Sequence, residues 1–369
     1  MSLSVGIVGL PNVGKSTLFN ALLKKQAAYV ANFPFATIEP NVGVVPVPDP
    51  RLAKLAQVVK SSEGMATLPP EVPAKVEFLD IAGLVAGAHR GEGLGNKFLA
   101  HIRETDAVCH VVRVFTDPEI VREGSTNPKS DFETVETELK LADLQTLEKQ
   151  VEPRGVTSKE EKLRWQVVLK LKEALQKGKP AREVALGEEE QSVARSLSLL
   201  TAKPILVALN VDEEQLREAG ELEGKYAKEL GVSPTQTVAI CAKTEAELAE
   251  LAPEEQKSYL KELGVEESGL ERLIQRSYAT LGLITFLTAG IKEVRAWTIK
   301  RYSSAQKAAG VIHSDFERNF IKADVISFEE FVAIGGWKAA REQGKVRSEG
   351  KSYLLQDGEV VEFKIGATV

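Results

Sequence analysis

The chain has 369 residues, 43% hydrophobic and 27% charged, which is the composition of an ordinary globular protein with room for two or three domains. Its net charge of −6 excludes a polycation, although residues 281–369 are slightly basic, with 13 Lys and Arg against 11 Asp and Glu. No apolar run approaches the ~20 residues of a membrane span, and no signal-peptide pattern opens the chain. The 2 cysteines are far apart and the 4 histidines lack metal-ligand spacing. These features argue against a disulfide scaffold or a zinc site and fit a cytoplasmic protein without a membrane partner.

Near the N-terminus, Ser4–Val8 is expected to form a short buried strand, and a helix is expected from about Ser16 to Lys24. Between them, Gly9–Ser16 fits the pattern G-x-x-x-x-G-K-[ST] in the strand–loop–helix context that this motif requires. Such loops turn backbone N–H groups toward phosphate oxygens, and the following helix adds its positive N-terminal dipole. Lys15 should reach the β- and γ-phosphates, and Ser16 should give its hydroxyl to Mg²⁺. The pattern therefore predicts binding of a purine nucleoside triphosphate with magnesium.

Asn12, inside this loop, has two interpretations. In some proteins with this pattern an asparagine here helps to hold a monovalent cation such as K⁺ beside the phosphates. The alternative, which we favour, is that Asn12 only caps the loop.

Two further residues are candidates for the metal shell. Lys75–Asp80 alternates like a strand, and Asp80-Ile81-Ala82-Gly83 follows the pattern D-x-x-G. Asp80 would hold Mg²⁺ through a water, and the N–H of Gly83 would sense the γ-phosphate. Thr37 lies in a loop where a threonine commonly completes the Mg²⁺ shell. The alternatives are a turn cap for Asp80 and a surface threonine for Thr37.

The residue after Gly83 is Leu84, where many GTPases place the glutamine that orients the attacking water. A leucine cannot do this, so the water must be held in another way. His89 lies in the glycine-rich segment that follows, and an imidazole there could position or deprotonate water. A surface histidine without a role is the equally weighted alternative.

Farther along, Ala107–Val114 is expected to be a strand, whereas the stretch from Asp131 to Thr201 shows no strand pattern. Apolar residues recur there at helical spacing, with a break near Pro153. We expect a helical hairpin inserted between two core strands; the alternative is a pair of helices packed flat on the main sheet.

Pro204–Leu209 is the next expected strand, and Asn210-Val211-Asp212-Glu213 follows it. Guanine-specific proteins carry Asn-Lys-x-Asp there, and the aspartate accepts hydrogen bonds from guanine N1–H and N2. Here that position is Glu213, and Val211 replaces the lysine. A longer carboxylate cannot occupy the same plane, and adenine offers the opposite hydrogen-bonding edge. The sequence thus favours ATP over GTP, with backbone groups around Val211 contacting the adenine edge, although Asp212 could swing in and restore guanine binding.

The last features are a short strand at Thr237–Ile240, followed by Cys241-Ala242-Lys243, which is similar to the Ser-Ala-Lys loop that closes over the base in such proteins. From Leu281 onward, short strand-like runs and Gly-rich turns indicate a separate α+β domain. The alternation of strands and helices before it predicts an α/β fold with a mainly parallel sheet. Ligands of such sheets bind at the carboxyl ends of the strands.

Together these residues resemble the YchF group of the Obg-like ATPases. The resemblance rests on Gly9–Thr17, Asn32–Ile38, Asp80–His89 and Asn210–Glu213, and toward the C-terminus on Glu293–Ile299 and His313–Glu317. It implies a Ras-like P-loop G domain over residues 1–130 and 202–280, a coiled-coil helical insertion at 131–201, and a small β-grasp TGS domain at 281–366.

The resemblance also implies an ATPase that associates with the ribosome or a ribosomal subunit, with rRNA as a further possible contact. Position by position, it gives the phosphate loop as Asn12, Val13, Gly14, Lys15, Ser16 and Thr17. It gives Ser16 and Thr37 as magnesium ligands, Val211 as the base contact, and His89 as the family's proposed catalytic histidine. The expected function is a slow ATPase switch; the alternatives are a GTP-specific switch and a ribosome-binding adaptor that holds nucleotide without useful turnover.

Overall fold

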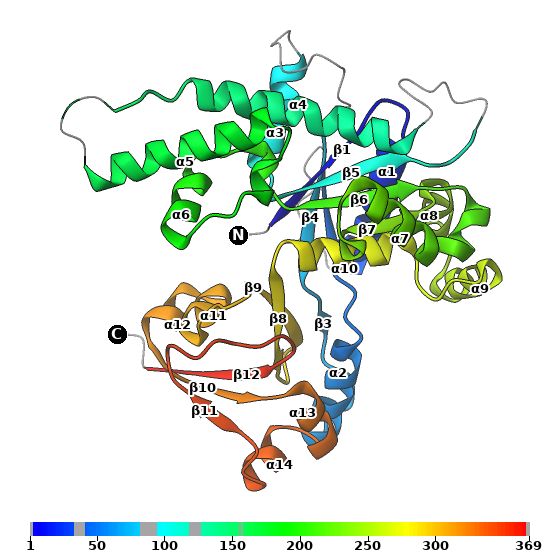
Figure 1. Cartoon of the computed structure of the whole chain (residues 1–369). Coiled ribbons are helices and arrows are strands. Elements are labelled where there is room, and N and C mark those ends of the chain that lie inside the picture. Colours follow the sequence, from blue (N-terminus) through cyan, green and yellow to red (C-terminus); the bar gives the residue numbers. More distant parts are fainter. Residues whose placement is uncertain are drawn as a thin grey trace. The chain divides into compact units, whose positions relative to one another are not determined.

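The computed structural model describes residues 3–32, 41–81, 94–117, 127–153, 155 and 158–366, with side chains undescribed at 28–32, 94–97 and 253. The chain forms two compact units (Figure 1). The first unit comprises Met1–Val45 and Glu77–Thr280, and the second comprises Pro46–Val76 and Leu281–Val369. Within the described residues, no helix is both long enough and apolar enough to span a membrane.

A six-stranded sheet with the order β2-β4-β1-β5-β6-β7 forms the centre of the first unit. Its strands are β1 (Ser4–Val8), β2 (Val42–Pro46), β4 (Lys75–Asp80), β5 (Ala107–Arg113), β6 (Ile205–Asn210) and β7 (Thr237–Ile240). The pairs β1–β4, β1–β5, β5–β6 and β6–β7 are parallel. Every residue of β1, β5, β6 and β7 is buried, as expected for a parallel sheet covered on both faces. The predicted α/β class with a mainly parallel sheet is confirmed.

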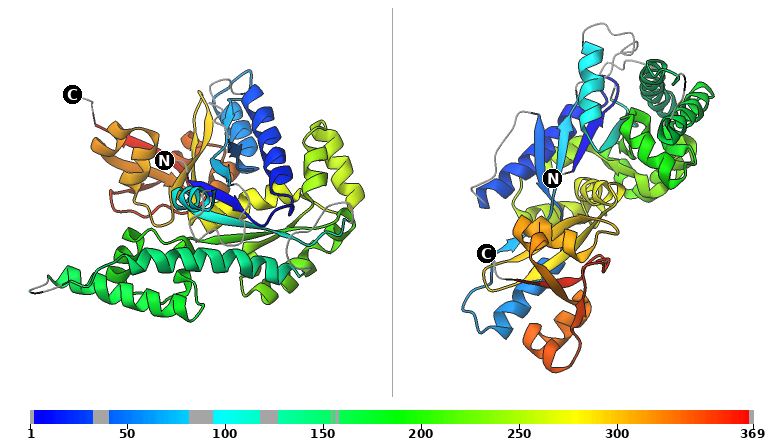
Figure 2. Two further views of the ribbon diagram at one scale, coloured as in Figure 1. Left: turned by 90° about the horizontal axis from the view of Figure 1, so that it is seen from above. Right: turned by 90° about the vertical axis from the view of Figure 1, so that its left-hand side faces the viewer.

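Helices cover both faces of this sheet (Figure 2). On one face lie α1 (Lys15–Asn32) and α10 (Gly269–Thr280), and on the other lie α4 (Pro128–Glu148) and α7 (Ala219–Leu230). The other described helices of the first unit outside residues 131–201 are α3 (Leu94–Glu104), α8 (Ala242–Leu248) and α9 (Pro253–Leu263), with the 3-10 turns η4 (Glu213–Glu218) and η5 (Pro234–Gln236). Because the strands run parallel, the loops that follow β1, β5, β6 and β7 meet at one edge of the sheet.

Between β5 and β6 the described chain is helical. It contains α4, α5 (Lys159–Gln176), η2 (Ala181–Glu183), α6 (Glu188–Ser196) and η3 (Leu200–Ala202). Helix α4 takes part in both arrangements that the sequence left open. Its N-terminal part lies on β5, where Phe132 contacts His110. Its C-terminal part packs against α5, and Leu147 shares a buried apolar cluster with Val168 and Leu171.

Buried polar contacts fix the ends of this insertion. The Asp143 carboxylate on α4, 1% exposed, accepts from the backbone N–H groups of Leu200 and Thr201, both at 2.8 Å, and from the Thr201 hydroxyl. Glu136, also on α4, lies 2.6 Å from the Arg182 guanidinium and 3.3 Å from His110 on β5. Burial opposes ionisation of Glu136, but these two neighbours bring the pKa of Glu136 down to about 2.

The second unit contains another six-stranded sheet, with the order β11-β10-β12-β8-β9-β3. Its strands are β3 (Glu71–Val72), β8 (Leu283–Ala289), β9 (Val294–Lys300), β10 (Phe320–Ile326), β11 (Arg347–Glu349) and β12 (Val360–Ile365). Helices α11 (Ala305–Ile312), α12 (Ser314–Arg318), α13 (Phe328–Ile334) and α14 (Trp337–Glu342) accompany them. The core includes Phe286, Ile299, Val325 and Val361. This is the α+β region that the sequence indicated from Leu281 onward.

Residues 46–76, which were expected in the G domain, belong to this second unit. Strand β3 pairs in parallel with β9, and α2 (Arg51–Ser62) packs against α13. Arg51 adds a contact to Asp357 at 3.1 Å. The chain therefore leaves the first sheet after β2, contributes a helix and a two-residue strand to the second unit, and returns to the first sheet as β4.

Candidate nucleotide-binding site

The loop Gly9–Gly14 connects the end of β1 to the start of α1 at the carboxyl edge of the sheet. Its backbone is tightly turned: Asn12 has φ 58° and Gly14 has φ 97°, values in the left-handed region. A side chain at Gly14 would run into the Asn210 amide, so only glycine fits there. The helix begins directly after the loop, at Lys15, so that its unpaired N–H groups adjoin the cavity described below.

Lys15 is the basic group at this end of the site. Its ammonium group donates to the Leu10 carbonyl at 2.6 Å, and the residue is only 7% exposed. Burial lowers the pKa of Lys15 to about 8, while the nearby Asp80 carboxylate works in the opposite direction. Asp80 ends β4, in register with Ile7 of β1, and burial raises its pKa against the opposing effect of Lys15. The two residues thus form an interacting pair beside the phosphate loop.

Asn210, at the end of β6, ties three loops together. Its side-chain nitrogen donates to the Val13 carbonyl at 2.9 Å, and its side-chain oxygen accepts from the Ala242 N–H at 3.0 Å. Its backbone carbonyl accepts from the N–H groups of Val114 and Phe115 at 2.8 and 2.9 Å. The side chain is 5% exposed, so these bonds form away from water. Predicted as a nucleotide-binding residue, Asn210 lines the cavity and also holds the surrounding loops in place.

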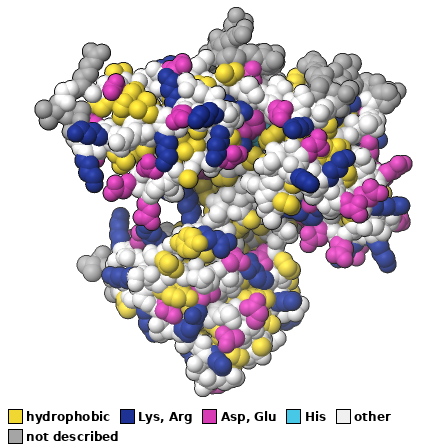
Figure 3. Space-filling model, viewed as in Figure 1, with side chains coloured by type: hydrophobic (Ala, Val, Ile, Leu, Met, Phe, Trp, Pro, Cys, Tyr) yellow, Lys and Arg dark blue, Asp and Glu magenta, His cyan; other side chains and the backbone are white. Residues whose placement is uncertain are grey.

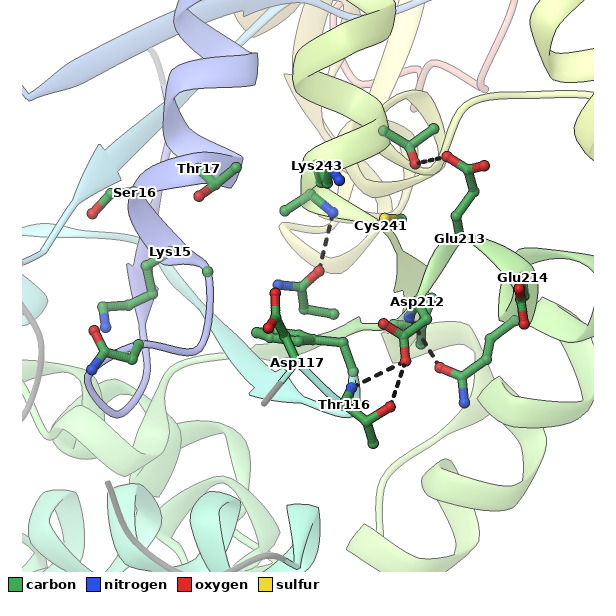
Figure 4. A pocket seen from close by; sticks show the side chains of 18 residues that line it. Lys15, Ser16, Thr17, Thr116, Asp117, Asp212, Glu213, Glu214, Cys241 and Lys243 are labelled. Carbon is green, nitrogen blue, oxygen red and sulfur yellow. Dashed lines mark hydrogen bonds between the residues drawn. The ribbon is translucent and has the colours of Figure 1, made fainter. Parts of the chain in front are cut away.

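The three residues after Asn210 have different partners, of which those of Asp212 and Glu213 can be followed in Figure 4. The N–H of Val211 donates to the Ile240 carbonyl at 2.9 Å. The Asp212 carboxylate accepts from the N–H and hydroxyl of Thr116, at 3.0 and 3.2 Å. The Glu213 carboxylate accepts from the hydroxyls of Thr244 and Tyr259, at 2.9 and 3.2 Å.

The loop after β5 is a part of the site that the sequence analysis did not name. Phe115, Thr116 and Asp117 line the cavity. Arg113 supports them, because its guanidinium lies 4.2 Å from the centre of the Phe115 ring and donates to the Asp117 carbonyl at 3.0 Å. One signal could have found this loop: it directly follows a predicted parallel strand, where ligand-binding loops occur.

These loops surround a cavity of about 920 Å³, which is large enough for a nucleoside triphosphate. Of the predicted nucleotide-binding residues, Asn12, Gly14, Lys15, Ser16, Thr17, Asn210, Val211 and Glu213 line it. Val13 is buried beneath the loop and contributes its carbonyl to Asn210. Thr37, Gly83, Leu84 and His89 lie outside the described residues.

The chemistry of the described donors fits Mg²⁺. Ser16 exposes its hydroxyl at the cavity, and Asp80 places a carboxylate near Lys15. Hydroxyl and carboxylate oxygens are the hard ligands that Mg²⁺ prefers, and nucleotide sites add phosphate oxygens and water to one or two of them. Among the described residues there is no cluster of three or more His, Cys, Asp or Glu that could hold a metal alone.

The sheet, the phosphate loop and the cavity define a P-loop nucleotide-binding protein with a G domain. The "Ribosome-binding ATPase YchF" of Bacillus subtilis (strain 168) is 48% identical over 371 residues and covers 99% of each chain. Its counterpart of the same name from Escherichia coli O157:H7 is 47% identical, covering 98% of this chain and 99% of its own. The chain belongs to the YchF family.

Further comparisons agree with this assignment. The solved "Structure of the Schizosaccharomyces pombe YchF GTPase" is 35% identical, covers 98% of both chains and superposes with a TM-score of 0.85. A family model described as "50S ribosome-binding GTPase" matches residues 4–152. The model YchF-GTPase_C, described as "Protein of unknown function (DUF933)", matches residues 283–366.

The role of Asn210 generates a first prediction. Asn210→Asp keeps an acceptor for the Ala242 N–H but replaces the donor to the Val13 carbonyl with an oxygen. We expect the free energy of unfolding to fall by about 1–3 kcal/mol and nucleoside triphosphate affinity to fall at least about tenfold. Chemical denaturation and calorimetry measure the two effects. The matched control is Asn20→Asp at an exposed position of α1, which should change neither; equal behaviour of the two variants would contradict the role.

The lowered pKa of Lys15 generates a second prediction. A phosphate beside the Lys15 ammonium group favours the charged form of the lysine, so nucleotide binding should raise the pKa of Lys15 from about 8. Binding at a pH above 8 should therefore be accompanied by uptake of a proton by Lys15. Affinity for a non-hydrolysable nucleoside triphosphate should therefore fall as the pH rises from 7 to 9. Calorimetry at pH 9 in two buffers of different ionisation enthalpy measures the proton uptake. Lys15→Arg should abolish that uptake, because a guanidinium group does not titrate there.

The direction of the same pKa shift also determines how the free energy of unfolding of the protein without nucleotide changes with pH. The folded-state pKa lies below the ordinary value of 10.5, so the unfolded chain binds more protons between about pH 8 and 10.5. The contribution of Lys15 to stability should therefore rise with pH across that window, opposite to the trend in affinity. Affinity independent of pH from 7 to 9, with no proton uptake, would contradict the assignment.

Proposed function

We propose that this protein is an ATP-binding and ATP-hydrolysing molecular switch of the cytoplasm that associates with the ribosome or one of its subunits. The preference for adenine rests on one observation: the Val211 N–H already donates a hydrogen bond to the Ile240 carbonyl, at 2.9 Å, so this N–H is not available to a base. We therefore assign base contact to the Val211 carbonyl, which accepts from the N6 amino group of adenine and repels the O6 of guanine. Relatives named "Ribosome-binding ATPase YchF" support both the base and the partner.

At the phosphate end, Lys15 exchanges the Leu10 carbonyl for oxygens of the β- and γ-phosphates. The N–H groups of Gly14–Thr17 bind the same phosphates at the start of α1. Ser16, Thr37 and Asp80 would hold Mg²⁺, which when bound neutralises charge on the phosphates. Asn12 provides the candidate contact to K⁺, with loop capping as the alternative. The left-handed backbone of Asn12 is compatible with either role.

For hydrolysis we assign the attacking water to His89, because Leu84 cannot orient it. Without a glutamine in that position, slow turnover is expected in the absence of a partner. ATP would draw Thr37 and the segment after Asp80 toward the γ-phosphate, and hydrolysis would release them.

Ribosome contact would involve the helical insertion at 131–201 and residues 281–366, to which we assign the β-grasp TGS fold. Charge alone does not identify a surface for rRNA, because basic and acidic side chains are interspersed on the face shown in Figure 3. Family membership carries this part of the proposal, together with the match of residues 4–152 to the model described as "50S ribosome-binding GTPase".

Two alternatives remain in the same framework. A GTP-specific switch would need Asp212 or Glu213 to turn toward the base. A nucleotide-holding adaptor without useful turnover would follow from Leu84 if His89 takes no part.

A third prediction concerns the base. Calorimetry should give at least about tenfold tighter binding of ATP than of GTP, because guanine leaves its N1–H without an acceptor and brings O6 against a carbonyl. The paired change Val211→Lys with Glu213→Asp should move the preference toward GTP. Tighter binding of GTP by the unaltered protein would support the GTP-specific switch.

A fourth prediction concerns turnover and partner together. Single-turnover ATP hydrolysis should be slow alone and faster with intact ribosomes, and the protein should sediment with ribosomes more strongly with a non-hydrolysable ATP analogue than with ADP. His89→Ala should slow hydrolysis at least about tenfold and leave ATP affinity unchanged. No phosphate release in the presence of ribosomes would favour the adaptor, and unaltered turnover of His89→Ala would remove the histidine from the mechanism.

A further inference from the structure

The residue in the base-reading position, Glu213, is turned to partners on its own protein. Its carboxylate accepts from the Thr244 hydroxyl at 2.9 Å and from the Tyr259 hydroxyl at 3.2 Å, and both bonds end on the same oxygen, Oε2. In Figure 4 the labelled Glu213 side chain is directed away from Lys15–Thr17, and a dashed line marks its bond with the Thr244 hydroxyl. Hydrogen bonds to an ionised carboxylate are among the stronger ones in proteins.

The two hydroxyls come from different helices, α8, whose first turn is held by Asn210, and α9, which packs against η4. Thr244 is 1% exposed in the first turn of α8, where the N–H of the neighbouring Ala242 is held by Asn210. Tyr259 lies on α9, which packs against η4, the turn that starts with Glu213. Partial burial and the bond to Glu213 raise the pKa of the Tyr259 hydroxyl still further above neutrality, where the hydroxyl is protonated and can donate. The carboxylate therefore has two donors ready in the nucleotide-free protein.

The direction of this carboxylate matters for both bases. A carboxylate facing the Watson–Crick edge would accept from the N1–H and N2 groups of guanine, as the aspartate of guanine-specific proteins does. Facing adenine, it would meet the lone pair of N1 and gain no donor there. Turning Glu213 toward guanine would break the two bonds at Oε2. Their loss, reduced because water can reach the exposed Glu213 side chain, is subtracted from GTP affinity. An adenine base makes no such demand.

We propose that Thr244 and Tyr259 are specificity-determining residues, which hold the Glu213 carboxylate away from the base and so penalise guanine. The inference deepens the proposed preference for ATP and rests on it. Base choice follows from the contacts of Glu213 as well as from the length of its side chain.

The test is the double variant Thr244→Val with Tyr259→Phe, which removes both hydroxyls and changes side-chain volume little. With the carboxylate released, the ratio of the dissociation constants for GTP and ATP should fall at least about tenfold, mainly through tighter GTP binding. Isothermal titration calorimetry of the full chain with non-hydrolysable analogues measures the ratio. Tyr226→Phe on α7 is the matched control and should leave it unchanged.

A third substitution separates a specific effect from loosened packing. Adding Glu213→Gln to the double variant should remove the acquired GTP affinity, because the gain depends on the carboxylate. If Thr244→Val perturbs the fold, as thermal unfolding would show, Tyr259→Phe alone should still lower the ratio about threefold. A gain in GTP affinity that persists with Glu213→Gln would overturn the inference.

The failure of the inference and the failure of the proposed function give different results. Tighter binding of GTP than of ATP by the unaltered protein would defeat the proposed base preference. If the unaltered protein prefers ATP, and the ratio of dissociation constants changes by less than about twofold in both hydroxyl variants, the base preference stands. The roles of Thr244 and Tyr259 would then be overturned.

Discussion

The nucleotide site depends on one buried amide, that of Asn210. Its side chain bonds the phosphate loop at Val13 and the base-side loop at Ala242, and its backbone carbonyl holds the start of the loop after β5. An amide suits this position because it offers a donor and an acceptor from one planar group. Val13 and Asn210 are 197 residues apart in the chain, yet their contact sets the distance between the phosphate end and the base end of the cavity.

At the phosphate end of the cavity, the charge of Lys15 is only partly compensated by the protein, and a phosphate ligand can complete the compensation. Burying a lysine without a fully compensating partner is unfavourable, and the lowered pKa of Lys15 expresses that cost. The Leu10 carbonyl and the nearby Asp80 compensate only in part. A triphosphate supplies further negative charge, so the same burial that lowers the pKa of Lys15 strengthens its contact with phosphate. This is how a chain with a net charge of −6 can bind an anionic ligand.

Sequence reasoning reached those parts of the site that are encoded locally. The strand Ser4–Val8 and the phosphate loop follow from short-range periodicity and from a motif whose spacing is fixed by backbone geometry. It failed where partners are distant: β3 has only two residues and no pattern of its own, so its pairing with β9 was invisible and residues 46–76 were assigned to the wrong unit. Phe115–Asp117 went unnamed for a related reason, because their place at the cavity depends on Arg113 and Asn210.

The base end shows why a motif alone underdetermines specificity. Four letters, Asn-Val-Asp-Glu, state which groups are available but not where they point. The hydroxyls that orient Glu213 lie 31 and 46 residues beyond it, and neither Thr244 nor Tyr259 is part of a motif recognised in the sequence. A carboxylate of the same length could contact a base in one setting and be directed away from it in another. The two settings differ by a few hydrogen bonds to the carboxylate. The free energy of such bonds is comparable to the free energy that corresponds to a tenfold preference for one base.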